Sequence, residues 1–257
     1  MSPRNSPRAT RRVVLVRHGD DPPDDRVVTH LLKAGYDPDI RRPFRGDLLG
    51  DVTDDVAGTV IYGGPYNAYD AALHPFLNEE YRWIDAALKA DIPMLGICQG
   101  AQMIAYHLGE WAGAPASGLH EFGYYEITPT GADPDFLPGP LHVVESHYHT
   151  FDLPKGAVHL ARSESYENQA FRLGDKVYGF QFHPEQTIEG FRRWQETKPG
   201  TYGMPGVQDR ETQTRLMLQH DAAQAEWFYG FLERLFPSLD GRQAPGEGPE
   251  QVKNVSN

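Results

Sequence analysis

The residues with the clearest chemical potential surround the only cysteine of the chain, in the stretch 96–102 (Gly-Ile-Cys-Gln-Gly-Ala-Gln). An apolar run at 92–95 precedes it, and residues 103–108 have the pattern of an amphipathic helix. A residue on a sharp strand-to-helix turn needs small neighbours, which the flanking glycines supply. Such a turn exposes the sulfur at the edge of a sheet, beside a helix N-terminus that favours the thiolate. The pattern therefore predicts that Cys98 is a nucleophile.

A partner base for this cysteine follows the alternating apolar run 178–182. Parallel strands end at one edge of a sheet, so His183 is expected to face the same edge as Cys98. Pro184 ends the strand, and Glu185 is near enough to orient and charge-stabilise the imidazole. We therefore predict a Cys–His–Glu triad. Two other interpretations exist: a free cysteine is often a buried apolar side chain, and a Glu at a helix start is also a favourable dipole partner.

Composition excludes several classes of protein. The chain has 257 residues and a net charge of −12, and an acidic surface disfavours nucleic-acid binding. One cysteine precludes an internal disulfide and suits a reducing compartment, so a cytoplasmic location is expected. No apolar run approaches the length of about 20 residues that a membrane span needs. We thus expect no nucleic-acid partner and no membrane partner.

The first half of the chain alternates strand-like and helix-like segments. Residues 13–16 form an apolar β run, and a helix is expected to begin at Asp24 or Asp25 and to end near Gly35. A polar, proline-rich passage continues to Asp55. Further elements are a strand at 60–62, a loop at 66–74 near the active-site edge and a helix at 78–90. This alternation predicts a doubly wound, mostly parallel α/β sheet flanked by helices.

From Gly123 onward short β runs dominate, which predicts a small antiparallel extension beside the main sheet. The expected runs are 124–128, 142–145, 158–161, 169–172 and 176–182, followed by a helix to Trp194, a polar loop at 195–207 and a last helix at 222–235. One domain is therefore expected over 13–238. Residues 1–12 are expected to form a disordered leader and 239–257 a disordered tail, because both are polar and lack an apolar pattern.

The cysteine turn and the His-Pro-Glu motif together resemble the class I (triad) glutamine amidotransferases, over about 13–236. The run 62–65 (Tyr-Gly-Gly-Pro) matches the oxyanion turn of the family, and 145–147 (Glu-Ser-His) matches its substrate-holding strand end. Residues 121–123 and 150–154 are similar to those of free-standing members related to the amidotransferase domain of GMP synthase. The chain departs from that subgroup at 146–149, where a tryptophan before the histidine and Gly-Asp after it are often found.

This resemblance implies a flavodoxin-like fold and roles for further residues. The oxyanion hole would be formed by backbone N–H groups of Gln99 and of the Gly63–Gly64 turn, and the glycine pair also fits an ordinary tight turn. Gln102 matches a position that contacts the glutamine substrate, although it could instead be a solvated helix residue. The main chain of two further residues would hold the amino-acid end of the substrate: Ser146 and His147.

A metal site is a weaker interpretation of the histidines near this strand end. His147 and His149 would share one strand face with Glu145, and His142 lies nearby in sequence. Zinc needs three or four convergent ligands, and nothing else marks this cluster, so we expect no metal and no cofactor. The acidic run at 20–25 is expected to be a solvated loop and helix N-terminus rather than a cation site.

Three functions are compatible with these patterns. The first is hydrolysis of the γ-amide of glutamine or of another γ-glutamyl compound through a γ-glutamyl thioester, which releases ammonia or an amine. The second is a glutaminase that supplies ammonia to a separate ATP-dependent synthetase, because this chain has neither a P-loop nor a pyrophosphatase loop. The third is a non-enzymatic sensor or assembly module, which the intact triad disfavours. We favour a self-sufficient γ-glutamyl hydrolase, since no acceptor site is visible.

Overall fold

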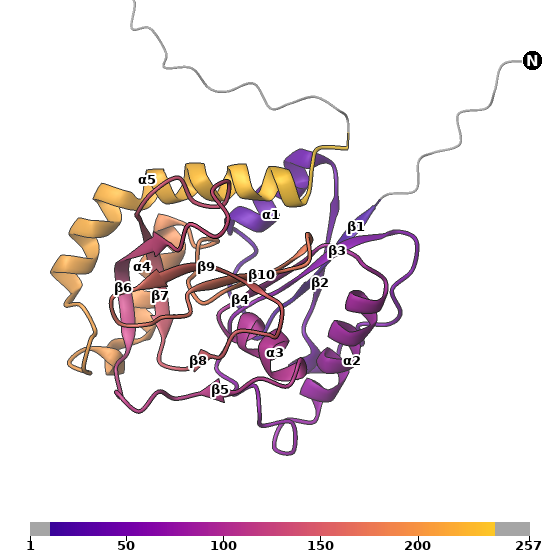
Figure 1. Cartoon of the computed structure of the whole chain (residues 1–257), viewed down its shortest axis with the longest axis horizontal. Coiled ribbons are helices and arrows are strands. Elements are labelled where there is room, and N and C mark those ends of the chain that lie inside the picture. Colours follow the sequence, from indigo (N-terminus) through magenta and orange to yellow (C-terminus); the bar gives the residue numbers. More distant parts are fainter. Residues whose placement is uncertain (1–10, 240–257) are drawn as a thin grey trace, which may run out of the picture.

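A nine-stranded sheet runs through the molecule in the order β2-β1-β3-β4-β11-β10-β9-β6-β7 (Figure 1). The computed structural model describes residues 11–239. Five strands are parallel: β2 (Asp37–Arg41), β1 (Arg12–Val16), β3 (Val56–Ile61), β4 (Met94–Ile97) and β11 (Val177–Phe180). Four antiparallel strands continue the sheet: β10 (Ala170–Leu173), β9 (Val158–Ser163), β6 (Glu121–Pro129) and β7 (Leu141–His147). The predicted α/β fold and its antiparallel extension are confirmed.

Helices cover both faces of the sheet, because the central parallel strands are apolar on both sides. Residues 13–16 are all fully buried. Val13 and Leu15 pack with α1 (Arg26–Ala34) and α5 (Arg210–Leu235) on one face. On the other face the same strand packs with α2 (Phe76–Lys89) and α3 (Gln99–His107). The remaining elements are β5 (Ala112–Gly113), β8 (Thr150–Phe151), α4 (Ile188–Thr197), η1 (Pro43–Arg45) and η2 (Pro199–Thr201).

Helix α1 begins and ends as its sequence predicts. The side chain of Asp25 accepts hydrogen bonds from the backbone N–H groups of Val27 and Val28, at 2.9 and 3.1 Å. Gly35 ends the helix in the left-handed region, with φ of 87°, where glycine carries no Cβ penalty. These local signals explain why the helix could be located without tertiary information.

The strand β2 lies within the polar, proline-rich passage in which no strand was expected. It is an edge strand with a Pro and three charged residues, so it lacks the apolar alternation that identifies a strand. Asp39 connects it to the neighbouring strand β1, because Arg12 donates to Asp39 at 2.7 Å. Within β2 itself, Arg41 also donates to Asp39, at 2.6 Å. Its parallel pairing with β1 and the contact of Asp39 with Arg12 both join segments that are distant in sequence, which a local pattern does not show.

The last helix, α5, begins at Arg210, twelve residues before the predicted start at 222. Several buried positions of the helix hold polar side chains, which hide its apolar period. Gln213 donates to the carbonyl of Phe122 at 2.8 Å, and Gln224 accepts from the backbone N–H of Val144 at 2.6 Å. These buried amides attach α5 to β6 and β7.

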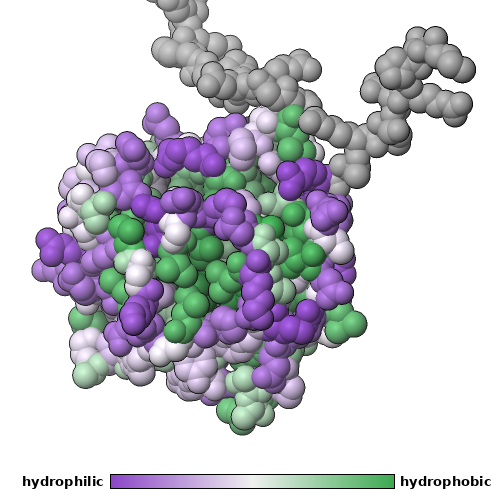
Figure 2. All heavy atoms as spheres, turned by 45° about the vertical axis from the view of Figure 1, so that its right-hand side comes forward, coloured by the Kyte–Doolittle hydropathy of each residue, from purple (hydrophilic) through white to green (hydrophobic). Residues whose placement is uncertain are grey.

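The described residues begin at Arg11 and end at Leu239. The first strand, β1, begins at Arg12, one residue before the expected boundary at 13. The predicted leader and tail otherwise lie outside the described residues. Hydrophilic side chains cover much of the face in Figure 2, around a hollowed area where hydrophobic ones gather. Within the described residues, no helix combines the length and the apolar character that crossing a membrane requires.

Candidate active site

Cys98 occupies a strained turn between β4 and α3. Its φ of 50° and ψ of −107° are unusual for a residue with a side chain. A Cβ on Gly96 would lie 2.6 Å from the carbonyl carbon of Gly100, and a Cβ on Gly100 would overlap the carbonyl oxygen of Ile61 in β3. Both glycines are therefore required by close backbone approach. The turn has the geometry that the flanking glycines predict.

The sulfur of Cys98 lies in a polar and largely buried setting. The residue is 6% exposed, and its Sγ is 3.9 Å from the carbonyl oxygen of Ser146. Burial alone would raise the pKa of the thiol, but the nearby charges of His183, His147 and Lys198 outweigh it and lower the pKa below its ordinary value. The N-terminus of α3 adds to this effect. The site therefore favours a thiolate.

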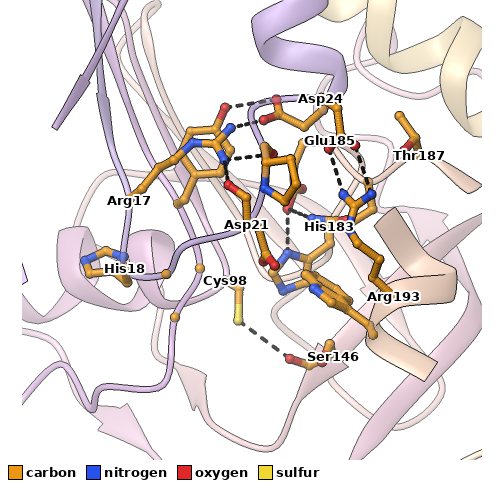
Figure 3. A pocket seen from close by; sticks show the side chains of 18 of the residues that line it. Arg17, His18, Asp21, Asp24, Cys98, Ser146, His183, Glu185, Thr187 and Arg193 are labelled. Atoms are coloured by element: carbon orange, nitrogen blue, oxygen red, sulfur yellow. Dashed lines mark hydrogen bonds and ion pairs between the residues drawn. The ribbon is translucent and has the colours of Figure 1, made fainter. Parts of the chain in front are cut away.

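His183 lies three residues beyond the end of β11, and its backbone N–H donates to the carbonyl of Val144 at 2.7 Å. Its Nδ1 is 2.8 Å from Oε1 of Glu185, and its ring makes a T-shaped contact with the Trp194 ring at 4.8 Å between centroids. Burial opposes the charged imidazole, yet Glu185 and Cys98 raise the pKa of His183 to about 10. Cys98 and His183 thus favour a thiolate–imidazolium pair (Figure 3).

Arg26 at the start of α1 holds the His-Pro-Glu turn in place. Its guanidinium donates to the carbonyl of Pro184 at 3.1 Å and to the carbonyl of Gln186. The same guanidinium forms a two-pronged contact with Asp221 of α5, at 2.7 and 2.8 Å. A buried arginine therefore connects two helices to the turn that carries the histidine. No local sequence pattern indicates this role of Arg26.

A second group of buried charged residues lines the same cavity as His183. Arg17, which follows β1, forms an ion pair with Asp25 and lies over the ring of Tyr62 at 4.6 Å. The hydroxyl of Tyr62 donates to Asp25 at 3.0 Å. Burial raises the pKa of Asp25, and the charge of Glu185 acts in the same direction, while Arg17 opposes both. These contacts hold the loop that follows β1 against Tyr62, which lies between β3 and the glycine turn at 63–64.

The glycine turn at 63–64 lies directly against the cysteine and the histidine. A Cβ on Gly63 would be 2.6 Å from Cε1 of His183 and 3.2 Å from Cβ of Cys98. A Cβ on Gly64 would meet the side chain of His18. Gln99 ties the turn to α3, because its Oε1 accepts from the backbone N–H of Tyr66 at 3.0 Å. The first N–H groups of a helix have no intrahelical partner, so those of α3 are suited to an anionic oxygen.

The two residues expected to hold the substrate occupy different environments. Ser146 lines the same cavity as Cys98. His147 lies outside the cavity lining, where its Nε2 is 3.0 Å from Glu121 and 3.3 Å from Glu145. Burial would lower the pKa of His147, but the two carboxylates raise it well above its ordinary value. Burial raises the pKa of Glu145 to about 7.

Glu121, Glu145 and His147 also have the spacing of a possible metal site. Within the described part of the chain, their ligand atoms all lie within 4.8 Å of one another. His147 accounts for the group without a metal, as a shared imidazolium between two carboxylates. Its Nδ1 faces the carbonyl of His149 at 2.8 Å. The cluster weighed from the sequence does not form, since His142 instead stacks on His220 at 3.9 Å between ring centroids.

Gln102 does not line the cavity. It is buried, and its Nε2 donates to the carbonyl of His149 at 3.1 Å and to Oε1 of Gln181 at 3.2 Å. In this arrangement Gln102 supports the loop that follows β7. The interpretation of Gln102 as a solvated helix residue is wrong, because the residue is only 3% exposed.

The cavity at the cysteine has a volume of about 250 Å³ (Figure 3). This is below the range of roughly 300–1,000 Å³ typical of pockets for drug-sized ligands, and it suits a small amino-acid derivative. Several charged or aromatic lining residues were not predicted as site residues: Arg17, His18, Asp21, Arg193, Trp194 and Lys198. Arg17, His18 and Asp21 follow β1 at the carboxyl edge of the sheet, a place where ligands commonly bind in such folds.

The acidic run at 20–25 is more strongly paired than a solvated loop. Asp25 caps α1 and pairs with Arg17, and Asp24 makes two contacts with Arg193, at 2.7 and 2.9 Å. Asp20 pairs with Arg45. The predicted helix start is confirmed, and two of the arginine partners, Arg45 and Arg193, come from elements that are distant in sequence.

Comparison with known proteins assigns this arrangement to a family. The model of the class-I glutamine amidotransferase family matches residues 26–193. The chain is 33% identical over 135 residues to the GMP synthase of Porphyromonas gingivalis, covering 51% of this chain and 25% of that protein. It therefore spans about a quarter of that synthase. It is also 33% identical over 167 residues to the glutamine amidotransferase-like protein YfeJ of Salmonella typhimurium, covering 60% of this chain and 67% of that protein.

Solved structures agree over most of the chain. A glutamine amidotransferase from Thermotoga maritima matches with a TM-score of 0.78 at 28% identity, covering 89% of this chain and 99% of that one. A glutamine amidotransferase from Methylobacillus flagellatus matches with a TM-score of 0.82 at 25% identity, covering 93% of this chain and 99% of that one. The likeness therefore includes the antiparallel part of the sheet as well as the parallel strands.

Proposed function

Because the chain belongs to the class-I glutamine amidotransferase family, we propose that it hydrolyses the γ-amide of glutamine or of another γ-glutamyl compound. Cys98 is the nucleophile, His183 the acid and base, and Glu185 the residue that orients His183. The observation that carries the proposal is the paired electrostatics of the site: the pKa of Cys98 is lowered while that of His183 is raised to about 10. A thiolate beside an imidazolium is the reactive form of a cysteine hydrolase.

The reaction begins when the thiolate of Cys98 attacks the γ-carbonyl carbon. The carbonyl oxygen becomes an oxyanion, which backbone N–H groups of Gln99 and the Gly63–Gly64 turn stabilise. His183 gives its proton to the leaving nitrogen as the carbon–nitrogen bond breaks, which yields ammonia or an amine and a γ-glutamyl thioester. His183 then takes a proton from water, the hydroxide attacks the thioester, and glutamate leaves as the thiolate forms again.

Glu185 acts through His183 in this scheme. Its carboxylate 2.8 Å from Nδ1 fixes the imidazole so that Nε2 faces the sulfur, and it stabilises the charge that the imidazole holds before each proton transfer. The contacts of Arg26 keep the turn between these two residues from relaxing. The mechanism needs no cofactor, and no partner residue is required for either half-reaction.

A second candidate is supply of ammonia to a separate ATP-dependent synthetase. GMP synthases are among the relatives, and the chain aligns with about a quarter of the length of the first of them. The loop at 66–74 adjoins the glycine turn, because Tyr66 is tied to Gln99. Contact of a partner with this loop would reach the oxyanion turn directly. A non-enzymatic role is disfavoured by the retained cysteine, histidine and glutamate.

Steady-state kinetics of the purified chain separates these candidates. The panel contains glutamine, γ-glutamyl amino acids and γ-glutamyl alkylamides, with release of ammonia or amine as the measurement. Turnover of a panel member without a partner, abolished in Cys98→Ser, supports a self-sufficient γ-glutamyl hydrolase. Turnover that arises only when a synthetase encoded beside it is added supports the ammonia-supplying role. No turnover in either setting contradicts both.

A further inference from the structure

A buried pair of ionisable side chains lies beside the glycine turn and takes no part in the proposed mechanism. His18 follows β1, and its Nε2 is 2.8 Å from Oε2 of Glu80 in α2. Both side chains are fully buried, with exposed fractions of 0%. His18 lines the cavity of Cys98, although its ring points away from the sulfur in Figure 3. The His18–Glu80 pair therefore connects the edge of the active site with a helix.

Glu80 occupies a position at which the buried face of α2 is otherwise apolar. The other buried residues of this helix are Leu77, Trp83, Ile84 and Ala87. Nδ1 of His18 and Oε1 of Glu80 are buried and have no hydrogen-bond partner among the described residues. A buried pair with unsatisfied atoms contributes little to folding stability compared with apolar side chains of similar volume. Stability alone therefore does not account for the pair.

The group that His18 contacts is the second glycine of the turn. A Cβ on Gly64 would overlap Cβ of His18 and would lie 2.8 Å from Oε1 of Gln99. Gly64 thus lies between His18 on one side and Gln99 on the other. The preceding residue, Gly63, packs against the proposed nucleophile and base. The turn is consequently enclosed between the reacting groups and a side chain that is bound to α2.

A second contact connects α2 with the same segment. Tyr66 follows the turn, and its backbone N–H donates to Oε1 of Gln99 at 3.0 Å. The ring of Tyr66 makes a T-shaped contact with Phe76, the first residue of α2, at 4.8 Å between centroids. Helix α2 therefore contacts this segment in two places, through the His18–Glu80 pair and through Phe76.

The backbone N–H groups of the turn are available to an oxyanion. Within the part of the chain that the structure describes, no hydrogen bond involves the backbone N–H of Gly63 or of Gly64. Stabilisation of an oxyanion depends steeply on the position of its donors, since a displacement of about 1 Å can cost roughly a hundredfold in rate. The groups that set the position of these two glycines therefore also set the rate of the reaction.

We infer that His18 is a positioning residue of the oxyanion turn and that Glu80 anchors it to α2. The inference rests on the proposed function, because the oxyanion is that of a γ-carbonyl attacked by Cys98. Glycine gives the turn no side-chain restraint of its own, so its placement depends on the groups that pack against it. His18 supplies such a restraint, and its bond to a buried carboxylate prevents the imidazole from rotating away from the turn.

The test separates oxyanion stabilisation from the reactivity of the sulfur. Hydrolysis of an active γ-glutamyl substrate passes through an oxyanion, so its kcat depends on the turn. Alkylation by iodoacetamide displaces iodide from a saturated carbon and forms no oxyanion, so its rate constant reports only the thiolate of Cys98. Amide hydrogen exchange of Tyr66, followed by NMR in protein with isotopically labelled tyrosine, reports the turn without any substrate. Tyr36 is the internal control, because its N–H donates to the carbonyl of Leu31 at 2.9 Å, outside the site.

Four variants are compared with the wild type: the double variant His18→Phe/Glu80→Leu, His18→Asn, Glu80→Gln and Asp85→Asn. The double variant replaces the pair by apolar side chains of similar size, so that no buried charge is left unpaired. His18→Asn is too short to reach Glu80. Glu80→Gln keeps an acceptor for Nε2 of His18. Asp85→Asn makes the matched carboxylate-to-amide change at an exposed position of α2, where Asp85 pairs with Lys89.

We expect the double variant and His18→Asn to lower kcat by roughly ten- to hundredfold, because loss of an oxyanion-hole donor costs that much or more. KM should stay within about twofold, since the interaction is made in the transition state. The iodoacetamide rate constant should be unchanged, and exchange of Tyr66 but not of Tyr36 should accelerate by roughly tenfold. Glu80→Gln should retain most of kcat, and Asp85→Asn should equal the wild type. Melting temperatures identify folded variants, and His18→Asn keeps the test decisive should the double variant not fold.

The outcomes distinguish this inference from the proposed function. If the wild type has no turnover while Tyr66 exchange accelerates in the variants, the pair positions the turn but the γ-glutamyl chemistry is wrong. Wild-type kcat and wild-type Tyr66 exchange in a folded double variant would overturn the positioning role. Equal acceleration of Tyr66 and Tyr36 would show that the pair only stabilises the fold, and a rise in KM alone would place its effect on substrate binding. Either of these results also overturns the inference.

Discussion

Replacing Glu185 by Gln tests how the histidine is controlled. The carboxylate 2.8 Å from Nδ1 stabilises the imidazolium and fixes its orientation. Glutamine has nearly the same shape but no charge, and its amide can present a donor where the imidazole also needs to donate. We therefore expect Glu185→Gln to lower kcat while the fold is retained. The pKa of His183 should fall, which moves the alkaline limb of the pH–rate profile to lower pH.

The size of the effect follows from the perturbed histidine. A rise in pKa from 6.5 to about 10 corresponds to about 5 kcal/mol of preference for the imidazolium, and the interaction is shared between Glu185 and Cys98. If Glu185 supplies about half, its loss removes about 2–3 kcal/mol. That free energy corresponds to a decrease in rate on the order of a hundredfold. The alkaline limb should shift by more than one pH unit.

The assay is kcat/KM on an active γ-glutamyl substrate between pH 5 and 11, together with the pH dependence of Cys98 alkylation by iodoacetamide. In the wild type, the lowered pKa of Cys98 places the acid limb below pH 9, and the raised pKa of His183 places the alkaline limb near pH 10. Glu185→Gln should narrow the plateau from the alkaline side. A rate within twofold of wild type, with an unmoved alkaline limb, would show that Glu185 does not control the charge of His183.

Three further predictions concern the framework of the site. Gly100→Ala should lower the melting temperature by at least about 4 °C, since the added Cβ overlaps the backbone carbonyl of Ile61. Gly139→Ala is the control, because a Cβ there has no neighbouring atom within 4 Å, and it should leave the melting temperature unchanged. Equal melting temperatures of the two variants would contradict this. Arg26→Met should lower kcat by roughly tenfold, because the His-Pro-Glu turn loses the two hydrogen bonds from Arg26 to its carbonyl groups. Arg82→Met serves as the surface control. Unchanged kinetics of Arg26→Met would show that the turn keeps its conformation without Arg26. The pKa of Glu145 is raised to about 7, so its contribution to folding stability is fully present below pH 4.5 and is lost as the pH rises through 7. In denaturant titrations over that pH window, the wild type should therefore lose about 3 kcal/mol more unfolding free energy than Glu145→Gln. Parallel stability curves for the two proteins would contradict this.

The features that could be predicted from the sequence are those with local causes. The turn at Cys98 is determined by its glycines, the start of α1 by Asp25, and the histidine motif by the strand and proline around it. The parallel pairing of the strands follows from their alternation with helices. Each of these signals lies within about ten residues of the feature that it predicts.

The missed features depend on contacts between distant segments. β2 is an edge strand with charged residues, and α5 hides its period under buried glutamines. Arg26 and Lys198 become site residues only when α1 and the end of α4 are brought to the edge of the sheet. From the sequence alone, a charged residue in an amphipathic segment is predicted to lie on the surface, because the residues that contact it are distant in sequence.

Mass spectrometry can detect the γ-glutamyl thioester on Cys98 directly, in the intact chain mixed with an active γ-glutamyl substrate and quenched in acid within milliseconds. We expect a covalent adduct of one γ-glutamyl group on the peptide that contains Cys98. The adduct should be sensitive to hydroxylamine and absent in Cys98→Ser. An adduct on another residue, or turnover that persists in Cys98→Ser without any adduct, would contradict it.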